Sequence, residues 1–299
     1  MNKLRMAMAR VLITGGAGFI GHHTSLLALD SGYEVHILDN LSSGLEENVE
    51  KIVSKGGVFH HGDVREAETL EHCMQGVDFV IHLAAQVSVS ASVEHPEQTL
   101  SVNIDGTTSV LAAAQECRVQ RLIFASSAAV YGDSEYVPIT ESAPLTPQSP
   151  YAVSKIVGEE LCRRSEIETC SMRFFNVYGD GQSQIGGYAA VIPTFKSAIA
   201  EGKIPNVFGD GTQIRDFIHV EDLATIIVRA LQIDYLPSEM NLASGIGTSI
   251  LQLLEILGAE TAEFMEPRQG DIHTSIAEIS LMKQIFPESY VRGIEEGLS

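Results

Sequence analysis

The chain has 299 residues, enough for one large domain or two small ones with a buried core. Apolar residues make up 44% of it and charged residues 19%, a globular composition that excludes a disordered chain. The net charge of −20 opposes non-specific binding to nucleic acid, although a small phosphorylated ligand needs only a few local cations. Residues 1–9 carry no apolar h-region or cleavage signal, so we expect no secretory leader. No apolar run reaches the ~18–20 residues of a membrane span. We therefore expect a cytoplasmic protein with no nucleic-acid or membrane partner.

Cysteine and histidine positions give no sign of a metal site. The four cysteines form no CxxC pair and no Cys/His cluster; they are Cys73, Cys117, Cys162 and Cys170. The pairs His22-His23 and His60-His61 also lack supporting ligands. We expect the thiols to be small buried groups in a reducing compartment, and we predict no bound metal.

The first half of the chain alternates β-branched runs with helical periodicity. We predict strands at Arg10–Thr14, Glu34–Leu38, Val58–His60, Phe79–Leu83, Leu122–Ser126 and Thr169–Phe174. We predict helices near residues 19–30, 44–54, 66–75, 96–117 and 150–166. This alternation indicates an α/β fold, a doubly wound parallel sheet with helices on both faces and a ligand crevice at the carboxyl ends of its strands.

After Asn176 the pattern becomes shorter and less regular. A loop rich in glycine (Gly179, Gly181, Gly186, Gly187) leads into a helix that ends near Ala200, and a turn follows at 209–211. We then predict a helix at Glu221–Gln232, a strand at Met240–Ala243 and a helix at Ser249–Leu257. The sequence thus predicts a main domain over 1–176 plus 215–244. A small discontinuous C-terminal lobe over 177–214 plus 245–299 would cap the crevice.

A glycine pattern follows the first predicted strand. Gly15, Gly18 and Gly21 permit a tight turn, close approach of the backbone to a pyrophosphate, and close packing of helix on strand. Asp39 closes the next strand, where a carboxylate accepts hydrogen bonds from ribose hydroxyls and repels a 2′-phosphate. This context predicts a Rossmann dinucleotide site that prefers NAD to NADP.

Two further strand ends supply candidates for the same site. Asp63 and Val64 follow the third strand, where they would contact the adenine edge. The fourth strand closes with Leu83, Ala84 and Ala85, whose small side chains let backbone lie near the cofactor. Ordinary packing of a helix on the sheet is an equal explanation for the two alanines.

The helix near 150–166 carries the catalytic candidates. It begins at Ser149-Pro150, and Tyr151 and Lys155 lie one turn apart on it. A phenol is a weak base at its reference pKa of ~10, but a neighbouring ammonium and an oxidised nicotinamide would bring the pKa of Tyr151 towards neutral. Ser127 lies just beyond the fifth strand, where its hydroxyl could bond the substrate oxygen as charge shifts there.

These residues and several motifs resemble the extended short-chain dehydrogenase/reductase family. The matching segments are GGAGFIG at 15–21, Ser127 before AAVYG, YAVSK at 151–155, FFNVYG at 174–179, RDFIHVEDL at 215–223 and RQGD at 268–271. They span nearly the whole chain, and the last three are similar to UDP-glucose 4-epimerases. The stretch between Ala243 and Arg268 is shorter than is typical of that family.

The resemblance implies a role for each matching position. Tyr151 would be the catalytic base and acid, Lys155 would tune it and hold the nicotinamide ribose, and Ser127 would bond the sugar O4. The NAD pocket would also be lined by Phe19, Ile20, Asn103 and the region of Phe174 and Tyr178. The UDP moiety would be held by Asn176, Phe208, Arg215, Arg268 and Asp271. The resemblance further implies a homodimer that pairs the helices near 96–117 and 150–166.

The absence of a carboxylate shortly after Ser127 distinguishes epimerisation from dehydration and decarboxylation in this family. Related sugar 4,6-dehydratases and UDP-glucuronate decarboxylases place an acidic residue shortly after the equivalent of Ser127. Here Ala128 and Ala129 occupy that place, and the next carboxylate is Asp133. We therefore predict NAD-dependent 4-epimerisation of a UDP-hexose through a transient 4-keto sugar.

Three questions stay open from the sequence. Ser275, seven residues beyond Arg268, corresponds to a position that lines the sugar pocket, and its small size predicts room for N-acetylated UDP-sugars as well as UDP-glucose. Another NAD-dependent nucleotide-sugar epimerase or oxidoreductase is the alternative within the same class. A non-catalytic sensor of NAD or nucleotide sugar is the alternative of a different class, since a fold does not fix a function.

Overall fold

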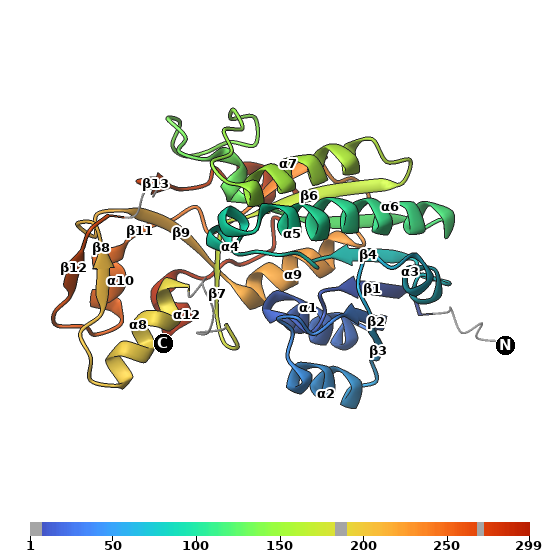
Figure 1. Ribbon diagram of the computed structural model, residues 1–299, viewed down its shortest axis with the longest axis horizontal. Helices are drawn as coiled ribbons and strands as arrows, with labels where there is room; N and C mark the ends of the chain where they lie inside the picture. The colour runs from blue at the N-terminus through green and yellow to red at the C-terminus, as the bar shows by residue number, and fades with distance from the viewer. Residues whose placement is uncertain (1–7, 183–189, 268–271) are drawn as a thin grey trace.

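A seven-stranded parallel sheet forms the centre of the computed structural model, which describes residues 8–182, 190–267 and 272–299. Its strands lie in the order β10-β6-β5-β4-β1-β2-β3 (Figure 1). They are β1 Arg10–Thr14, β2 Glu34–Asp39, β3 Val58–His61, β4 Phe79–His82, β5 Arg121–Ser127, β6 Glu168–Phe174 and β10 Glu239–Leu242. All adjacent pairs are parallel, which confirms the predicted doubly wound fold and its strands.

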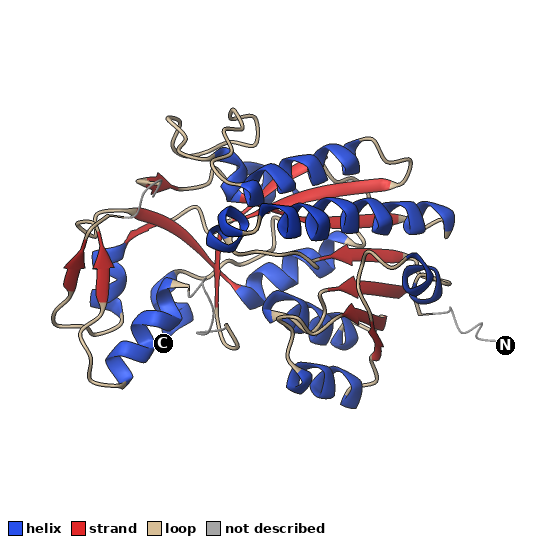
Figure 2. Cartoon of the chain, in the orientation of Figure 1, coloured by secondary structure: helices blue, strands red, loops and turns tan. Residues whose placement is uncertain are grey.

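Each central strand sends alternate side chains into two different cores, because successive residues of a strand point to opposite faces. Val11 and Ile13 of β1 pack with one core, and Leu12 between them packs with the other. The first core is covered by α1 Phe19–Asp30, α2 Glu46–Ser54 and α9 Val220–Ala230. The second is covered by α3 Ala67–Cys73, α6 Gly106–Glu116 and α7 Pro150–Arg163 (Figure 2). Burial on both faces explains why these strands are almost continuously apolar.

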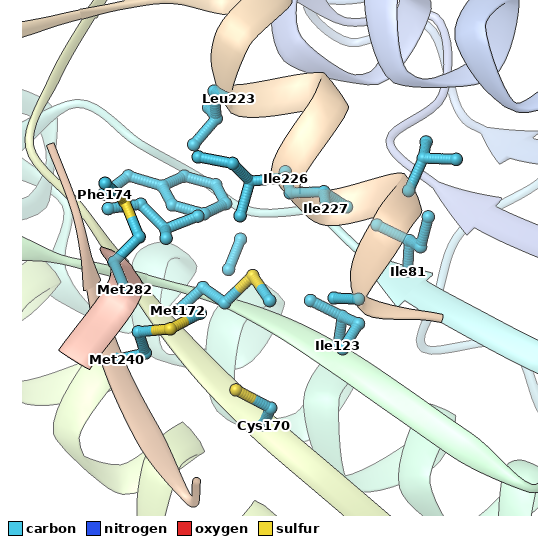
Figure 3. Close-up of a cluster of buried hydrophobic side chains, with 14 of the residues drawn as sticks. Ile81, Ile123, Cys170, Met172, Phe174, Leu223, Ile226, Ile227, Met240 and Met282 are labelled. Atoms are coloured by element: carbon cyan, nitrogen blue, oxygen red, sulfur yellow. The ribbon is translucent and has the colours of Figure 1, made fainter. Parts of the chain in front are cut away.

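Helix α9 illustrates how the first core is built (Figure 3). Its side chains Leu223, Ile226 and Ile227 face strand residues of the sheet, among them Ile123 and Met172. All five are fully buried. This packing fixes α9 across the middle of the sheet.

The segment predicted as one helix near 96–117 has three parts. Helix α5 covers Pro96–Leu100, a π-helical turn covers Ser101–Asp105, and α6 then continues to Glu116. The amide of Gly106 bonds to the carbonyl of Ser101, five residues back. A preceding helix, α4 Val89–Glu94, was not predicted because its small and polar residues carry no amphipathic pattern.

The smaller lobe is built on two short sheets at one end of the main sheet (Figure 1). One contains β7 Asn176–Tyr178, β9 Ile214–His219, β11 Gly247–Ser249 and β13 Thr274–Ser275. The other pairs β8 Asn206–Phe208 with β12 Glu263–Met265. The remaining helices are α8 Val191–Ala200, α10 Ile250–Ile256, α11 Ser280–Ile285 and α12 Ile294–Leu298. The helices predicted to end near Ala200 and to cover 249–257 are confirmed.

Strand β9 joins the lobe to the main sheet and was not predicted as a strand. Phe217 packs in the lobe core, while its neighbour Ile218 packs in the first core of the main sheet. The proposed division of the chain at residue 215 therefore falls at the start of a strand that both cores share.

Other expectations concern single groups. The four cysteines are free; Cys73, Cys162 and Cys170 are buried as predicted, whereas Cys117 is only half-buried. His219 caps α9 by accepting a hydrogen bond from the amide of Glu221. Within the described ranges, no helix combines the length and apolar character that crossing a bilayer requires.

Asp216 on β9 fastens the lobe to its surroundings. Its carboxylate, which is completely buried, accepts hydrogen bonds from the amides of Ser244, Gly245 and Ala277 and from the hydroxyl of Ser244, at 2.6–3.2 Å. Those donors belong to segments that follow β10 and β13, so one carboxylate ties three segments together.

Replacing Asp216 with alanine should leave those buried amides without an acceptor. We expect the free energy of unfolding to fall by about 3 kcal/mol, because each buried unpaired donor costs about 1–3 kcal/mol. Urea denaturation followed by circular dichroism measures this change. Asp234→Ala, at an exposed site, is the control and should change stability little. Equal stability of the two variants would contradict the assigned role.

Candidate active site

The turn between β1 and α1 is shaped by glycine. Gly15 has φ of +70°, and its amide donates to the carbonyl of Leu38 at 2.8 Å. A Cβ on Gly15 would lie 2.8 Å from the amide nitrogen of Ala84, and one on Gly21 would lie 2.1 Å from the carbonyl oxygen of Gly15. The turn, the head of α1 and the end of β4 are thus packed backbone against backbone. Gly18 is the residue that precedes α1.

Asp39 closes β2 beside this turn, as predicted. Its Oδ2 accepts from the amide of Ala17 at 3.0 Å, and its Oδ1 accepts from the amide of Leu41 at 2.8 Å. The carboxylate is nearly buried and fixed in direction. A carboxylate oxygen has a second lone pair, so each can still accept a bond from a ribose hydroxyl.

Asp63, at the end of β3, is held by the neighbouring Arg65. The guanidinium donates to both carboxylate oxygens, at 2.8 and 2.7 Å, and Asn40 donates at 3.1 Å. The Arg65 hydrogen bonds lower the pKa of Asp63 to about 2, so it is ionised across the physiological range. The side chain of Val64 is buried in the second core, which leaves only its backbone for an adenine contact.

The loop after β4, which contains Leu83, Ala84 and Ala85, is held from the π-helical turn. Asn103 accepts from the amide of Gln86 at 2.7 Å and donates to its carbonyl at 3.1 Å. Asn103 also donates to the hydroxyl of Ser154 on α7 at 2.9 Å. Asn103 is buried, so the structure shows it positioning this loop.

A buried histidine that sequence reasoning missed supports the same strand ends. His82 lies between Thr14 and Thr107, with its ring nitrogens 2.7 and 3.0 Å from their hydroxyls. Burial lowers the pKa of His82 to about 3, which makes it neutral at pH 7. The Thr107 hydroxyl donates to a backbone carbonyl, so it accepts from the histidine. No periodic pattern of residues indicates this link, because it depends on the pairing of β1 with β4.

Helix α7 presents the catalytic candidates. Ser149 caps it by accepting from the amide of Ala152 at 3.1 Å. Tyr151 and Lys155 are both buried, and the Lys155 ammonium lies 5.7 Å from the centre of the Tyr151 ring. Lys155 donates to the carbonyl of Ala125 at 2.8 Å, and burial lowers its pKa to about 8.

Ser127 is the last residue of β5, two positions beyond the carbonyl that Lys155 contacts. Its hydroxyl accepts from the amide of Ala129 at 3.2 Å and begins a short 3-10 turn at 128–131. Strand β5 and helix α7 therefore bring the three predicted catalytic residues to one end of the sheet. A lysine with a lowered pKa beside a tyrosine and a serine is typical of a proton-transfer site.

The predicted substrate residues lie on the lobe and its junction. Asn176 opens β7 and donates to the carbonyl of Asp216 at 3.0 Å. Arg215 on β9 is opposite Ser275 of β13, whose side chain is buried. Arg268 and Asp271 lie outside the described residues.

An open pocket of about 800 Å³ adjoins Phe208, the last residue of β8. Its lining comes from the turn after β8, from β12 and from the following segment: Gly209, Asp210, Gln213, Phe264, Met265, Glu266, Pro267 and His273. Arg215 reaches the same region, donating to the carbonyl of His273 at 3.4 Å. A flat apolar group with polar edges would suit this lining.

Three residues predicted to line the cofactor pocket contact other side chains of the protein. Phe19 begins α1 and its ring meets that of His23 at 5.9 Å, while Ile20 packs against the first core. Tyr178 is buried in the lobe core, edge-on to Phe217 and to His219. Tyr178 therefore contributes to the packing of the lobe.

The residues present fit a dinucleotide. The glycine turn leaves no room for side chains where the backbone must approach a pyrophosphate, and α1 has no acidic residue in its first turn. Asp39 supplies an acceptor for a ribose. Among the described residues, no group of three or more His, Cys, Asp or Glu side chains is arranged to hold a metal ion.

Comparison with known proteins settles the family. A model described as the NAD dependent epimerase/dehydratase family matches residues 11–243. The chain belongs to this family. The family's chemistry depends on NAD, which confirms the predicted cofactor and the resemblance seen in the sequence.

Individual relatives are similar to this chain in length and fold. The UDP-glucose 4-epimerase of Bacillus subtilis is 35% identical over 318 residues, covering 96% of this chain and 94% of its own. The UDP-N-acetylglucosamine 4-epimerase of Methanobrevibacter ruminantium M1, in complex with UDP-N-acetylmuramic acid, is similar with a TM-score of 0.91 at 35% identity, covering 98% and 96%. An NAD-dependent NDP-hexosamine 5,6-dehydratase of tunicamycin biosynthesis also matches, with a TM-score of 0.87 at 33% identity, covering 97% and 95%.

The glycine turn can be tested directly. In Gly21→Ala the new methyl group would collide with Gly15, so the turn must open. We expect NAD affinity to fall about tenfold or more, since overpacking costs about 1–3 kcal/mol. Calorimetric titration of NAD into protein from which bound NAD has been removed measures this affinity. Gly293→Ala, where a Cβ meets nothing within 4 Å, is the control; unchanged NAD affinity in Gly21→Ala would refute this account of the turn.

Proposed function

We propose that this protein is a UDP-hexose 4-epimerase that uses bound NAD. The observation that carries the proposal is the convergence of Tyr151, Lys155 and Ser127 at the end of β5, next to a turn that contains no carboxylate. Curated relatives named as UDP-glucose 4-epimerases, at about a third identity along most of the chain, support it. Because dehydratases share the fold, the reaction has to be argued from the site.

The site favours epimerisation over dehydration. The turn after Ser127 carries Ala128 and Ala129, and the next carboxylate along the chain, Asp133, is exposed beyond the turn. The carboxylate of Glu159 lies behind the catalytic residues, but it is bonded to Arg173 and buried. A second acid or base for elimination at C5 and C6 is therefore not supplied by this turn.

Three side chains would carry out or assist the proton transfer at the 4-hydroxyl. NAD, when bound, accepts and returns the hydride of C4. Tyr151 takes the proton of the 4-hydroxyl and later gives it back, and the Lys155 ammonium favours the phenolate form that this requires. Ser127 bonds the same oxygen and stabilises it as it becomes a carbonyl. Between the two hydride transfers the 4-keto sugar, still attached to UDP, would rotate and present its opposite face. The hydride would return to the same carbon, so no net oxidation occurs.

The lobe would hold the UDP moiety. Arg215 and Arg268 would bind the diphosphate with planar guanidinium groups, and Phe208 would pack against the uracil. Asn176 and Asp271 would bond the nucleotide and its ribose. The open pocket beside Phe208 and the position of Arg215 near it support this assignment. The main domain, over 1–176 plus 215–244, would bind NAD, and the lobe, over 177–214 plus 245–299, would bind the sugar nucleotide.

We also propose a homodimer in the cytoplasm. The helices near 96–117 and 150–166, observed as α5 to α6 and α7, contact one another along one face of the sheet. Val153 on α7 remains 41% exposed, as a side chain that a partner helix would cover. The free cysteines fit a reducing compartment.

The central experiment uses purified protein without added cofactor. UDP-galactose and UDP-N-acetylgalactosamine are incubated separately, products are resolved by anion-exchange chromatography, and denatured protein is assayed for released NAD. Conversion of UDP-galactose, with about one NAD per chain, is the expected result for a tightly held cofactor. If neither sugar turns over even after NAD is supplied, the epimerase proposal fails for these substrates.

Tyr151→Phe should remove the general base without removing its ring. We expect kcat with UDP-galactose to fall by about two to four orders of magnitude, the usual contribution of general acid–base catalysis, with NAD still bound. Initial rates and NAD content measure both effects. Tyr136→Phe, at a tyrosine that is 63% exposed, is the matched control. A Tyr151→Phe enzyme that keeps wild-type kcat would assign the proton transfer elsewhere.

Ser275→Tyr tests the breadth of the sugar pocket. If the small side chain leaves room for an N-acetyl group, the added ring should exclude it by steric clash. We expect activity on UDP-N-acetylgalactosamine to fall about tenfold or more, while activity on UDP-galactose is largely kept. The ratio of kcat/KM for the two sugars measures this. Full activity of the variant on the acetylated sugar would overturn the argument.

A further inference from the structure

A buried ion pair lies directly behind the catalytic residues. Glu159 is one helical turn beyond Lys155 on α7, and Arg173 lies on β6. The guanidinium donates to both carboxylate oxygens, at 2.8 and 2.7 Å. The two side chains are only 1% and 3% exposed. Burying such a pair is costly and often gives no net stability, so its place at the site calls for another explanation.

The carboxylate also holds the end of β5. Glu159 accepts from the hydroxyl of Ser126 at 2.5 Å. One turn earlier on the same helix face, Lys155 donates to the carbonyl of Ala125 at 2.8 Å. Ala125 and Ser126, the two residues before Ser127, are thus hydrogen-bonded to α7. The distance of Ser127 from Tyr151 depends on these two hydrogen bonds.

Arg173 extends the contact to the turn that follows Ser127. Its Nη1 donates to the hydroxyl of Tyr131 at 2.9 Å and to the carbonyl of Glu141 at 2.8 Å. The Tyr131 hydroxyl in turn donates to Asn241 on β10 at 2.6 Å. The turn at 128–131 is therefore anchored by polar contacts to two strands of the sheet, β6 and β10.

The charges around Lys155 also indicate a role for Glu159. Burial lowers the pKa of Lys155, and two neighbours on α7, Cys162 and Glu159, oppose this effect. Two titratable groups that face Lys155 carry no charge near pH 7: burial lowers the pKa of His82 to about 3 and raises the pKa of the Cys162 thiol to about 12. The catalytic Tyr151 is the remaining neighbour, and it is the group that the ammonium serves.

We propose that Glu159 is a positioning residue for the reaction, which fixes the end of β5 that carries Ser127 and keeps Lys155 in its ammonium form. The catalytic part rests on the function proposed above for Tyr151 and Lys155. The effect of Glu159 on the Lys155 ammonium does not depend on any substrate.

Glu159→Gln tests both parts, because it removes the charge while keeping the size of the side chain. Glu160→Gln is the matched control, since that neighbouring carboxylate is 42% exposed and paired with Arg163 and Arg164 at the surface. The titration of Lys155 is followed by NMR of 13Cε-labelled lysine, and its signal is identified by its loss in Lys155→Met. Steady-state rates with UDP-galactose are measured in parallel.

In Glu159→Gln we expect the Lys155 signal to titrate about one pH unit lower than in the wild type, since a nearby opposite charge favours the charged form. We expect kcat at pH 8 to fall about tenfold, with KM changed less than about threefold because the UDP contacts are on the lobe. Glu160→Gln should match the wild type in both measurements. The proposal would be overturned if Glu159→Gln lowered kcat and raised KM in proportion while the titration of Lys155 stayed unchanged. Glu159 would then have only a general structural role.

A second variant covers the case in which Glu159→Gln fails to fold with Arg173 left unpaired. The double variant Glu159→Gln/Arg173→Gln removes both charges, and we expect its Lys155 titration to lie between those of the single variant and the wild type. If Lys155 titrates as in the wild type in every folded variant, the proposal is wrong. A wild-type protein that does not convert UDP-galactose, but whose Lys155 titration shifts as expected, would refute the proposed function alone.

Discussion

The close packing of α7 on β5 is the constraint on which the site depends. A Cβ on Gly158 would lie 2.3 Å from the ring of Phe124, so only glycine lets the helix approach the strand this closely. At this separation Lys155 reaches the carbonyl of Ala125, and Tyr151 comes to lie beside the strand end. A larger residue at position 158 would move α7, with the proposed catalytic residues on it, outwards and break these contacts together. The geometry of the proposed catalytic residues thus depends on a glycine whose role is packing.

The substrate side depends on a different kind of contact. The lobe contains short strands and helices whose own core is small. Its connection to the main domain runs through β9, which contributes Phe217 to the lobe core and Ile218 to the main core. Asp216 between them accepts several backbone hydrogen bonds. Arg215, adjacent to this buried carboxylate, is therefore attached to a rigid strand, which suits a residue proposed to grip a diphosphate.

Much of the cofactor half follows from local sequence signals. The glycine turn, Asp39 and the pair Tyr151 and Lys155 all depend on short-range spacing next to predicted strands or helices, and the structure places them at neighbouring strand ends. Sequence patterns of this kind report on backbone conformation and helix faces, both of which are local.

What the sequence did not reveal depends on contacts between distant segments. The partners of Glu159 and His82 come from segments far apart in the sequence, whose relative positions are decided by tertiary packing. Strand β9 was missed because its polar residues, Arg215 and Asp216, obscure an apolar strand that pairs on both sides. Tyr178, which the resemblance assigns to the cofactor pocket, also packs in the core of the lobe, a contact between distant segments that no local pattern indicates.

The two backbone contacts of Asp39 bear on attempts to redesign the cofactor preference. Leu41 has φ of 57°, a left-handed conformation that costs a non-glycine residue about 1–2 kcal/mol, and the Asp39 carboxylate bonds its amide. The same carboxylate holds Ala17 in the glycine turn. Exchanging Asp39 for a neutral residue to admit a 2′-phosphate would therefore also release a strained loop and the glycine turn that we expect to hold the pyrophosphate. A change of cofactor in this scaffold would require the loop at 40–45 to be rebuilt together with the acidic residue.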